Sequence, residues 1–454
     1  MEILIKIIYL IMSLSILVFL HEMGHYLTAR MFKIRVDKFY LFFDFLFPLQ
    51  NVLKFSIFKK KIGDTEWGLG WFPMGGYVQI NGMIDESMDK ETMAQPEQPW
   101  EFRSKPAWQR LIVMLGGVIV NVILGIVIFW FILSKWGDSY LPTANLKYGI
   151  YADSIALKMG LQNGDKIVSI DGKKVENFAA IPGQIILNNA KTIQIERDSQ
   201  MMDVNIPSGA IGLLAKSKKE GFMSPRTRFW ISDVSSGSNA LKAGLEKGDR
   251  VVMINNKKVE FYDEVKASLK ENKSTTVPFV IERKGKTITK QVAITDVGTI
   301  GVGLGDTIDL KLKSTSYTII EAFPAAVERS VITITNYIKG LNQVFLSLVG
   351  RSNVKASDSV GGFASMAKLF PSNWGDWYQF WSITAIISLI LAFMNLLPIP
   401  ALDGGHALFC LYEMIFRRKP SVKFLEYSQY VGMAILLGLM LFANLNDVYK
   451  AWFK

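Results

Sequence analysis

Residues Leu17–Phe32 read LVFLHEMGHYLTARMF. It contains the pattern HEMGH, in which His21 and His25 stand four residues apart. Residues at this spacing lie on one face of a helix, one turn apart, so both imidazoles can reach one metal ion. Glu22 follows the first histidine, within reach of a water molecule at that metal. The stretch therefore predicts a metal site with a carboxylate beside it.

The same stretch ends an apolar segment. Residues Ile7–Leu20 carry no charge and run directly into His21. Three later stretches, Leu111–Ser134, Trp377–Leu397 and Tyr427–Asn446, are also uncharged. Because a helix needs about 20 residues to cross the hydrocarbon core of a bilayer, the sequence predicts four spans. A cleavable signal peptide is the alternative for the first segment, but no small-residue cleavage pattern follows it.

Charge and cysteine content narrow the class of protein. The net charge is +11, but the basic residues are dispersed, so nucleic-acid binding is not expected. Lysine and arginine are abundant in the loops between spans one and two and between spans three and four. Both loops are therefore predicted to be cytoplasmic, with both termini and residues 136–376 on the outer side of the plasma (inner) membrane. The single cysteine, Cys410, excludes an intrachain disulfide and a CxxC metal motif.

A third metal ligand is expected near the end of the third span. A catalytic zinc site usually has three protein ligands and one open position. The chain has three histidines, and the third lies in NLLPIPALDGGH, which runs from Asn395 to His406. This segment offers Asp403 and His406 as candidates. A carboxylate at membrane depth costs roughly 2.5–3.5 kcal/mol, so Asp403 is expected to face a partner such as a divalent cation.

A repeat lies between spans two and three. ALKMGLQNGDKIVSIDGKKV begins at Ala156 and ALKAGLEKGDRVVMINNKKV at Ala240, with twelve of twenty positions identical. Such a repeat usually marks a duplicated structural unit. Its Gly-Leu-x-x-Gly-Asp turn resembles that of the permuted PDZ domains of bacterial proteases. PDZ domains bind peptides by adding a strand to a sheet edge. A steric filter, or packing of the two copies on each other, is an equally open alternative.

Taken together, these motifs are similar to the site-2 protease family, in particular to its bacterial branch that regulates sigma-E. The resemblance rests on HExxH in span one, NxxPxxxLDG from Asn395, and the PDZ-like tandem, and it covers nearly the whole chain. It implies that Zn²⁺ is the cofactor, that His21, His25 and Asp403 are its ligands, and that Glu22 is the general base. It also implies that Asn395 contacts the substrate or the oxyanion, and that His406 supports the zinc ligands indirectly. The second span departs from the common Gly-Pro-x-x-Asn pattern, with Val118 after Gly117 and before Asn121.

A glycine-containing β-element is expected to hold the substrate. The segment from Glu66, EWGLGWFPMGGYVQINGM, is interpreted as a membrane-associated hairpin in which Gly75 and Gly76 allow a substrate backbone to approach. The family has a membrane-entering β-loop in this region, and an ordinary interfacial hairpin is the alternative. From Ile319, helical periodicity predicts a pair of amphipathic helices on the outer membrane surface, with core packing as the alternative.

The expected fold is a multi-pass α-helical membrane protein with four transmembrane helices, a membrane-associated β-hairpin and an inserted α+β tandem of PDZ domains. The predicted division is 1–31 span one, 32–106 cytoplasmic-side loop with the hairpin, 107–135 span two, 140–213 and 214–305 the PDZ domains, 306–375 amphipathic helices, 376–406 span three, and 426–447 span four.

The resemblance implies hydrolysis of peptide bonds within single-pass membrane proteins, such as anti-sigma factors or remnant signal peptides. An upstream site-1 protease would act first, and the tandem would exclude untrimmed substrates. The site would lie near the cytoplasmic side of the bilayer. The rival interpretation is a non-catalytic PDZ scaffold with a structural metal, but such a scaffold has no need for Glu22 beside its ligands.

Overall fold

The computed structural model divides into two compact units. The helical unit contains Met1–Asp138, Ser316–Leu341 and Val360–Lys454, and the repeat unit contains Ser139–Thr315 and Asn342–Ser359. Within these units the structure describes residues 1–46, 53–73, 75–83, 96–207, 209–217, 222–304, 310–352 and 354–453.

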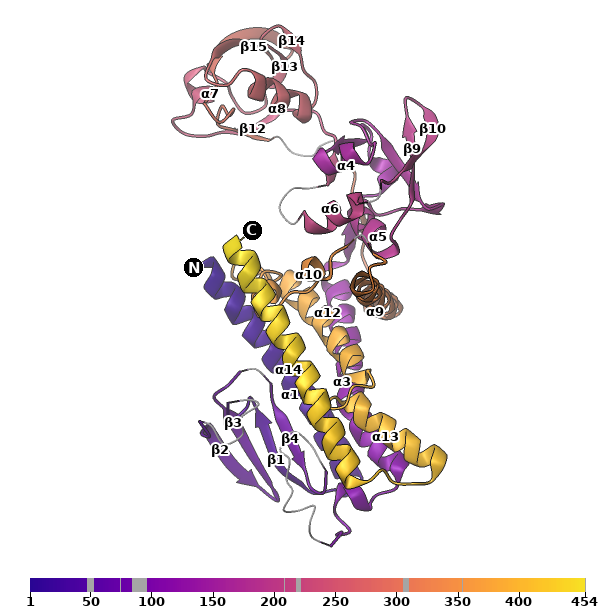
Figure 1. Cartoon of the computed structure of the whole chain (residues 1–454). Coiled ribbons are helices and arrows are strands. Elements are labelled where there is room, and N and C mark those ends of the chain that lie inside the picture. The colour runs from indigo at the N-terminus through magenta and orange to yellow at the C-terminus, as the bar shows by residue number, and fades with distance from the viewer. Residues whose placement is uncertain are drawn as a thin grey trace. The chain divides into compact units, whose positions relative to one another are not determined.

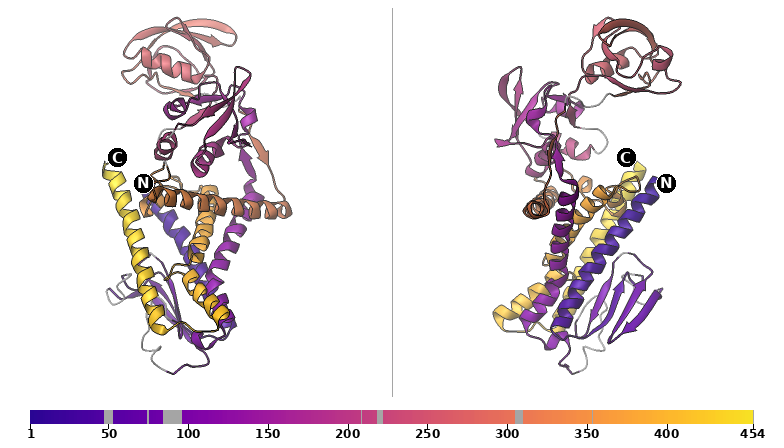
Figure 2. Two further views of the ribbon diagram at one scale, coloured as in Figure 1. Left: turned by 45° about the vertical axis from the view of Figure 1, so that its right-hand side comes forward. Right: turned by 180° about the vertical axis from the view of Figure 1, so that it is seen from behind.

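Among the described residues, four helices of the helical unit are long and apolar enough to cross a membrane, in agreement with the four predicted spans. Three of them, α1 (Glu2–Met31), α3 (Ala107–Trp136) and α12 (Trp377–Leu396), lie side by side (Figures 1 and 2). Helix α3 contacts α1 and α12. Its outer side exposes Ile119, Ile123 and Val127, which recur at helical spacing, as expected where lipid replaces water. The bounds are α1 Glu2–Met31, α3 Ala107–Trp136, α12 Trp377–Leu396 and α14 Val422–Phe453.

The third span is shorter than the predicted 376–406. Helix α12 ends at Leu396, and Leu397 is extended because the residue before a proline disfavours the helical conformation. Pro398 and Pro400 follow in the chain, and a new helix, α13 (Asp403–Phe416), begins at the candidate ligand Asp403. The motif therefore lies at a break between two helices, so Asp403 is in the first turn of α13.

The predicted hairpin is wrong in its pairing. The strands are β1 Val36–Leu41, β2 Ser56–Ile62, β3 Thr65–Gly70 and β4 Tyr77–Ile80, and they form one sheet in the order β2-β3-β1-β4. Strand β1 separates β3 from β4, pairing parallel with the first and antiparallel with the second. The true hairpin is β2–β3, and β4 is an edge strand.

One long helix replaces the predicted amphipathic pair. Helix α9 runs continuously from Ile319 to Leu348, with Pro324 in its second turn, where the proline removes only one early hydrogen bond. In the helical unit, its first half lies across the long helices (Figure 2). Ala322 and Ala326 pack against α3 and α12, whereas Ile320 and Phe323 are exposed. Two short helices follow, α10 Ala356–Ser359 and α11 Phe363–Ala367.

The repeat unit contains two modules with the same sheet. In the first, the strand order is β10-β9-β7-β8, and in the second the equivalent order is β16-β15-β13-β14. The first module consists of β6 Ile150–Ala152, α4 Ser154–Lys158, β7 Lys166–Ile170, β8 Lys173–Lys174, α5 Ile181–Asn188, β9 Thr192–Arg197, β10 Gln200–Asn205, α6 Ala210–Lys216 and β11 Met223–Pro225. The second consists of β12 Ile231–Val234, α7 Asn239–Lys242, β13 Arg250–Ile254, β14 Lys257–Lys258, α8 Tyr262–Glu271, β15 Thr276–Arg283, β16 Lys286–Ala293 and β17 Val302–Leu304.

The boundary between the modules differs from the predicted 213/214. Helix α6 crosses that point, and β11 pairs with β6 of the first module. Leu214 and Phe222 belong to the first hydrophobic core. The first module therefore extends to Pro225. A separate strand pair, β5 (Asp138–Tyr140) with β18 (Lys313–Thr315), joins the two ends of the inserted segment.

The repeated Gly-Asp turn has the same structural role in both modules. Asp165 accepts two hydrogen bonds from Arg197, at 2.7 and 2.8 Å, and one from the Gln162 backbone. Asp249 accepts the same pair from Arg283, again at 2.7 and 2.8 Å. Burial opposes ionisation, but the Arg283 guanidinium holds the pKa of Asp249 below its usual range. The motif thus ties the turn to the central strand of each sheet.

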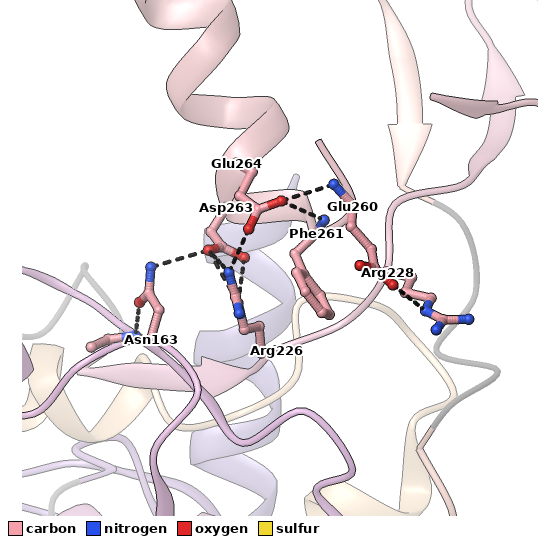
Figure 3. Close-up of polar contacts among 8 residues, drawn as sticks. Asn163, Arg226, Arg228, Glu260, Phe261, Asp263 and Glu264 are labelled. Atoms are coloured by element: carbon pink, nitrogen blue, oxygen red, sulfur yellow. Dashed lines mark hydrogen bonds and ion pairs between the residues drawn. The ribbon is translucent and has the colours of Figure 1, made fainter. Parts of the chain in front are cut away.

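A buried carboxylate connects the two modules (Figure 3). Asp263 Oδ2 accepts hydrogen bonds from Asn163 Nδ2 of the first module and from Arg226 Nη2 of the linker, both at 3.0 Å. Asn163 Oδ1 in turn accepts the Ala152 backbone N–H at 2.8 Å. The Arg226 guanidinium lies 3.9 Å from the centroid of the Phe261 ring. These contacts hold the linker against both modules.

Candidate metal centre

Helix α1 presents its two histidines toward α3. His25 Nδ1 lies 2.9 Å from the Val113 carbonyl oxygen. A carbonyl can only accept, so Nδ1 carries the proton and Nε2 keeps its lone pair. The Nε2 atoms of His21 and His25 lie 3.3 Å apart. The spacing read from the sequence therefore brings two imidazole nitrogens to one point.

Small residues allow α1 and α3 to cross closely at this point. A Cβ added at Gly24 would overlap the Gly116 backbone. A Cβ at Gly117 would lie 2.5 Å from both His21 Cε1 and His25 Nε2. A larger residue at either position would push the helices apart or displace the imidazoles, so the glycines create the space for the two rings.

Asp403 reaches the same point from the start of α13. Its Oδ2 atom lies 3.2 Å from His21 Nε2 and 3.3 Å from His25 Nε2. The three ligand atoms all lie within 4.8 Å of one another. Two residues before Asp403, Ala401 has a φ of 77°, which is unusual for a residue with a side chain. The backbone thus turns sharply to bring the carboxylate to the histidines.

This arrangement fits a divalent cation. Asp403 Oδ2 is buried and has no hydrogen-bond partner among the described residues. It faces the lone pair of His25 Nε2, so two acceptors meet without a proton between them. A buried charge without a partner is costly, and a cation removes that cost. Two histidines and one carboxylate are also a ligand set that occurs in catalytic zinc sites.

The centre lies in a cavity of about 310 Å³ in the helical unit. Every residue proposed from the sequence lines it: His21, Glu22, His25, Gly75, Gly76, Asn395, Asp403 and His406. Asn395 Nδ2 lies 3.2 Å from His21 Nε2, on the ligand side of the ring. His406 is outside the group of three and contacts Gln429.

The edge strand β4 forms one wall of this cavity. Gly75, Gly76, Tyr77 and Val78 all line it. A Cβ at Gly76 would lie 2.6 Å from the Tyr40 carbonyl oxygen, so only glycine fits there without displacing the backbone. The Tyr77 hydroxyl donates to Asp44 Oδ1 at 3.0 Å. Burial and the Asp44 carboxylate raise the pKa of Tyr77, so this phenol remains a neutral donor.

Sequence reasoning missed several residues at the centre. Asn121 had been noted only as part of a variant motif, yet its amide lies 3.2 Å from His21 Nδ1. Gln429, on α14, lines the cavity and is buried. Neither the Val113 carbonyl nor Gln429 belongs to a sequence motif, so no signal pointed to them.

Helix α14 packs on the backbone that carries Asp403. A Cβ at Gly432 would overlap the Pro400 carbonyl oxygen, whereas nothing lies within 4 Å of a Cβ at Gly438. Gly432→Ala should therefore displace the helix or the loop and reduce cleavage by up to about 10²-fold, the cost of a misplacement near 1 Å. Gly438→Ala, in the same helix, should leave the rate unchanged. Equal rates for the two variants, measured on one substrate, would show that this contact does not position the loop.

Comparisons with known proteins agree with the geometry. The sequence model of peptidase family M50 matches residues 9–439. Relatives named "Putative zinc metalloprotease" occur in Neisseria meningitidis serogroup A, Vibrio cholerae serotype O1 and Rickettsia conorii. They are 26%, 26% and 27% identical, over 97%, 96% and 98% of this chain and 98%, 97% and 98% of their own lengths. Since the match extends over nearly the whole sequence, the chain belongs to peptidase family M50, the site-2 protease family.

Proposed function

We propose that this chain is an intramembrane zinc metalloprotease that hydrolyses peptide bonds within the membrane segments of single-pass proteins. The observation that carries the proposal is the meeting of His21, His25 and Asp403 within 4.8 Å, with both histidines on a helix apolar enough to span a membrane. Glu22 stands in the same cavity. A structural metal site has no use for this carboxylate, so it favours the enzyme over the scaffold interpretation.

Each residue of the cavity has a proposed role. His21, His25 and Asp403 hold the zinc ion. When bound, zinc supplies Lewis acidity, which activates water at neutral pH and polarises the scissile carbonyl. Glu22 takes the proton from the attacking water and later delivers a proton to the leaving amine. Asn395 offers its amide N–H to the substrate carbonyl oxygen, and His406 supports the ligands through its contacts without binding the metal.

Strand β4 would hold the substrate in an extended form. A peptide bond in a membrane helix is hydrogen-bonded within that helix, and leaving its groups unpaired in lipid costs several kcal/mol each. Strand β4 is an edge strand, and its cavity side offers backbone groups to an unwound segment. Gly75 and Gly76, which precede this strand, line the same cavity. The cavity thereby admits water and an extended peptide, although it lies among apolar helices.

Mapping of the cut tests the proposed function. The purified chain, in nanodiscs, is incubated with a synthetic single-pass substrate, and mass spectrometry locates the new termini. We expect new termini inside the apolar segment. Cleavage confined to the flanking soluble regions would exclude an intramembrane protease.

The two modules would act as PDZ domains that limit which substrates reach the membrane, with trimming by a site-1 protease coming first. The repeated sheet order and the Asp–Arg turns support this assignment. Both termini and the modules would lie outside the plasma membrane, with the zinc site nearer the cytoplasmic side. Anti-sigma factors and remnant signal peptides fit such a site.

Loosening the junction between the modules should weaken the filter. Asp263→Ala removes the carboxylate that joins Asn163 to Arg226, while Arg226 keeps its ion pair with Glu264, so the repeat unit should lose about 1–3 kcal/mol of stability. Asp233→Ala removes an exposed carboxylate from the same module and should change stability by less than about 0.5 kcal/mol. Denaturant unfolding measures both effects. In cleavage assays, Asp263→Ala should lower the ratio of the cleavage rate of trimmed substrate to that of full-length substrate. An unchanged ratio would argue against a filter that depends on the arrangement of the modules.

A further inference from the structure

Asn121 lies on α3 behind the ring of His21, on the side away from Asp403. It is 1% exposed. Its side-chain Nδ2 lies 3.2 Å from His21 Nδ1, and its Oδ1 atom is buried without a hydrogen-bond partner among the described residues. Its backbone carbonyl accepts a hydrogen bond from Ser388 Oγ at 2.7 Å, which ties this turn of α3 to α12. The side chain is therefore held in place, and one of its polar atoms is left unsatisfied.

The proposed zinc ion decides which end of this amide faces His21. Asp403 Oδ2 lies 3.2 Å from His21 Nε2, so a cation held there would take the Nε2 lone pair. The proton of the neutral ring is then on Nδ1. An Nδ1–H requires an oxygen in front of it. An amide turned end for end supplies that oxygen, and it also satisfies the orphaned Oδ1.

We propose that Asn121 is a positioning residue: its side-chain oxygen accepts the Nδ1–H of His21 and fixes the tautomer whose Nε2 lone pair faces Asp403. The inference rests on the proposed metal centre. Helix α3 would then supply both acceptors of the centre, the Val113 carbonyl for His25 and the Asn121 amide oxygen for His21. Such outer contacts fix the orientation of ligating histidines, and their loss typically lowers metal affinity 10–100-fold.

Zinc affinity of the full-length chain, measured by competition with a chelator, tests this role. Asn121→Leu keeps the approximate shape but removes the acceptor, so zinc binding should weaken about 10–100-fold. Asn121→Asp keeps an acceptor and should bind zinc within a few-fold of wild type. Ser134→Ala removes a hydroxyl that bonds the Trp130 carbonyl on the same helix, thirteen residues beyond Asn121, and its affinity should be unchanged. Wild-type affinity in Asn121→Leu, or an equal loss in Asn121→Asp, would overturn the proposal.

A second measurement does not depend on bound metal or on the folding of Asn121→Asp. Because the chain has three histidines, ¹⁵N-histidine labelling gives few signals, and their shifts report which ring nitrogen carries the proton. In the metal-free wild type, His21 should be protonated at Nδ1, and Asn121→Leu should convert it to a tautomer mixture. A wild-type proton on Nε2 would refute the assignment. If the wild type failed to bind zinc but showed the Nδ1 tautomer, the metal centre would be wrong and the Asn121 contact would stand.

Discussion

Replacing Glu22 by glutamine should reduce cleavage about 10²–10⁴-fold, the range that a general base contributes. The amide has nearly the same shape but cannot take a proton from water. Zinc content should stay at the wild-type level, because the group of three ligands does not include Glu22. Turnover of a synthetic membrane segment and metal analysis of the same preparation measure the two quantities.

Glu2→Gln is the matched control, since it makes the same chemical change at the exposed start of the same helix. It should cleave at the wild-type rate. Turnover by Glu22→Gln that matched this control would remove Glu22 from the mechanism, whereas loss of zinc from Glu22→Gln would show that the carboxylate is a ligand.

Asp403→Ala should lose both metal and activity. The carboxylate is the only non-histidine member of the group of three ligands found among the described residues, and its Oδ2 lies 3.2–3.3 Å from both Nε2 atoms. Its removal should lower zinc affinity by more than the 10–100-fold typical of outer contacts. Chelator competition on the purified variant measures this loss.

His406→Ala distinguishes the two candidates in the same segment. His406 lines the cavity but lies outside the group of three, so this variant should keep stoichiometric zinc. Any decrease in its cleavage rate would come from the loss of the contacts through which His406 supports the zinc ligands. The reverse pattern, with zinc kept by Asp403→Ala and lost from His406→Ala, would mean that the third ligand is misassigned.

The three residues that meet at the proposed metal centre could be predicted because their signals are local. Spacing on one helix placed His21 and His25 together, and the two prolines before Asp403 indicated a break that frees the chain to turn. The contact of Asn121 with His21 could not be predicted in this way. It depends on how closely α1 and α3 cross, which Gly24 and Gly116 set through backbone packing.

The sheet shows a different limit of sequence reasoning. Apolar and glycine residues from Glu66 onward indicated strands, but strand pairing depends on segments distant in sequence. Strand β1 begins at Val36, within the segment that the sequence predicts as a cytoplasmic-side loop, and inserts between β3 and β4. The predicted boundary between the modules was wrong for a similar reason. Strand β11 returns to pair with β6, about seventy residues earlier, and no local pattern marks that pairing.

Cleavage within a membrane segment should depend on bound zinc. The purified wild-type chain is stripped of metal by a chelator, supplied with one equivalent of Zn²⁺, and assayed on a synthetic single-pass substrate at each stage. We expect cleavage inside the apolar segment to disappear on stripping and to return with zinc. Cleavage that survives complete removal of metal, or no cleavage by the zinc-loaded chain, would contradict this expectation.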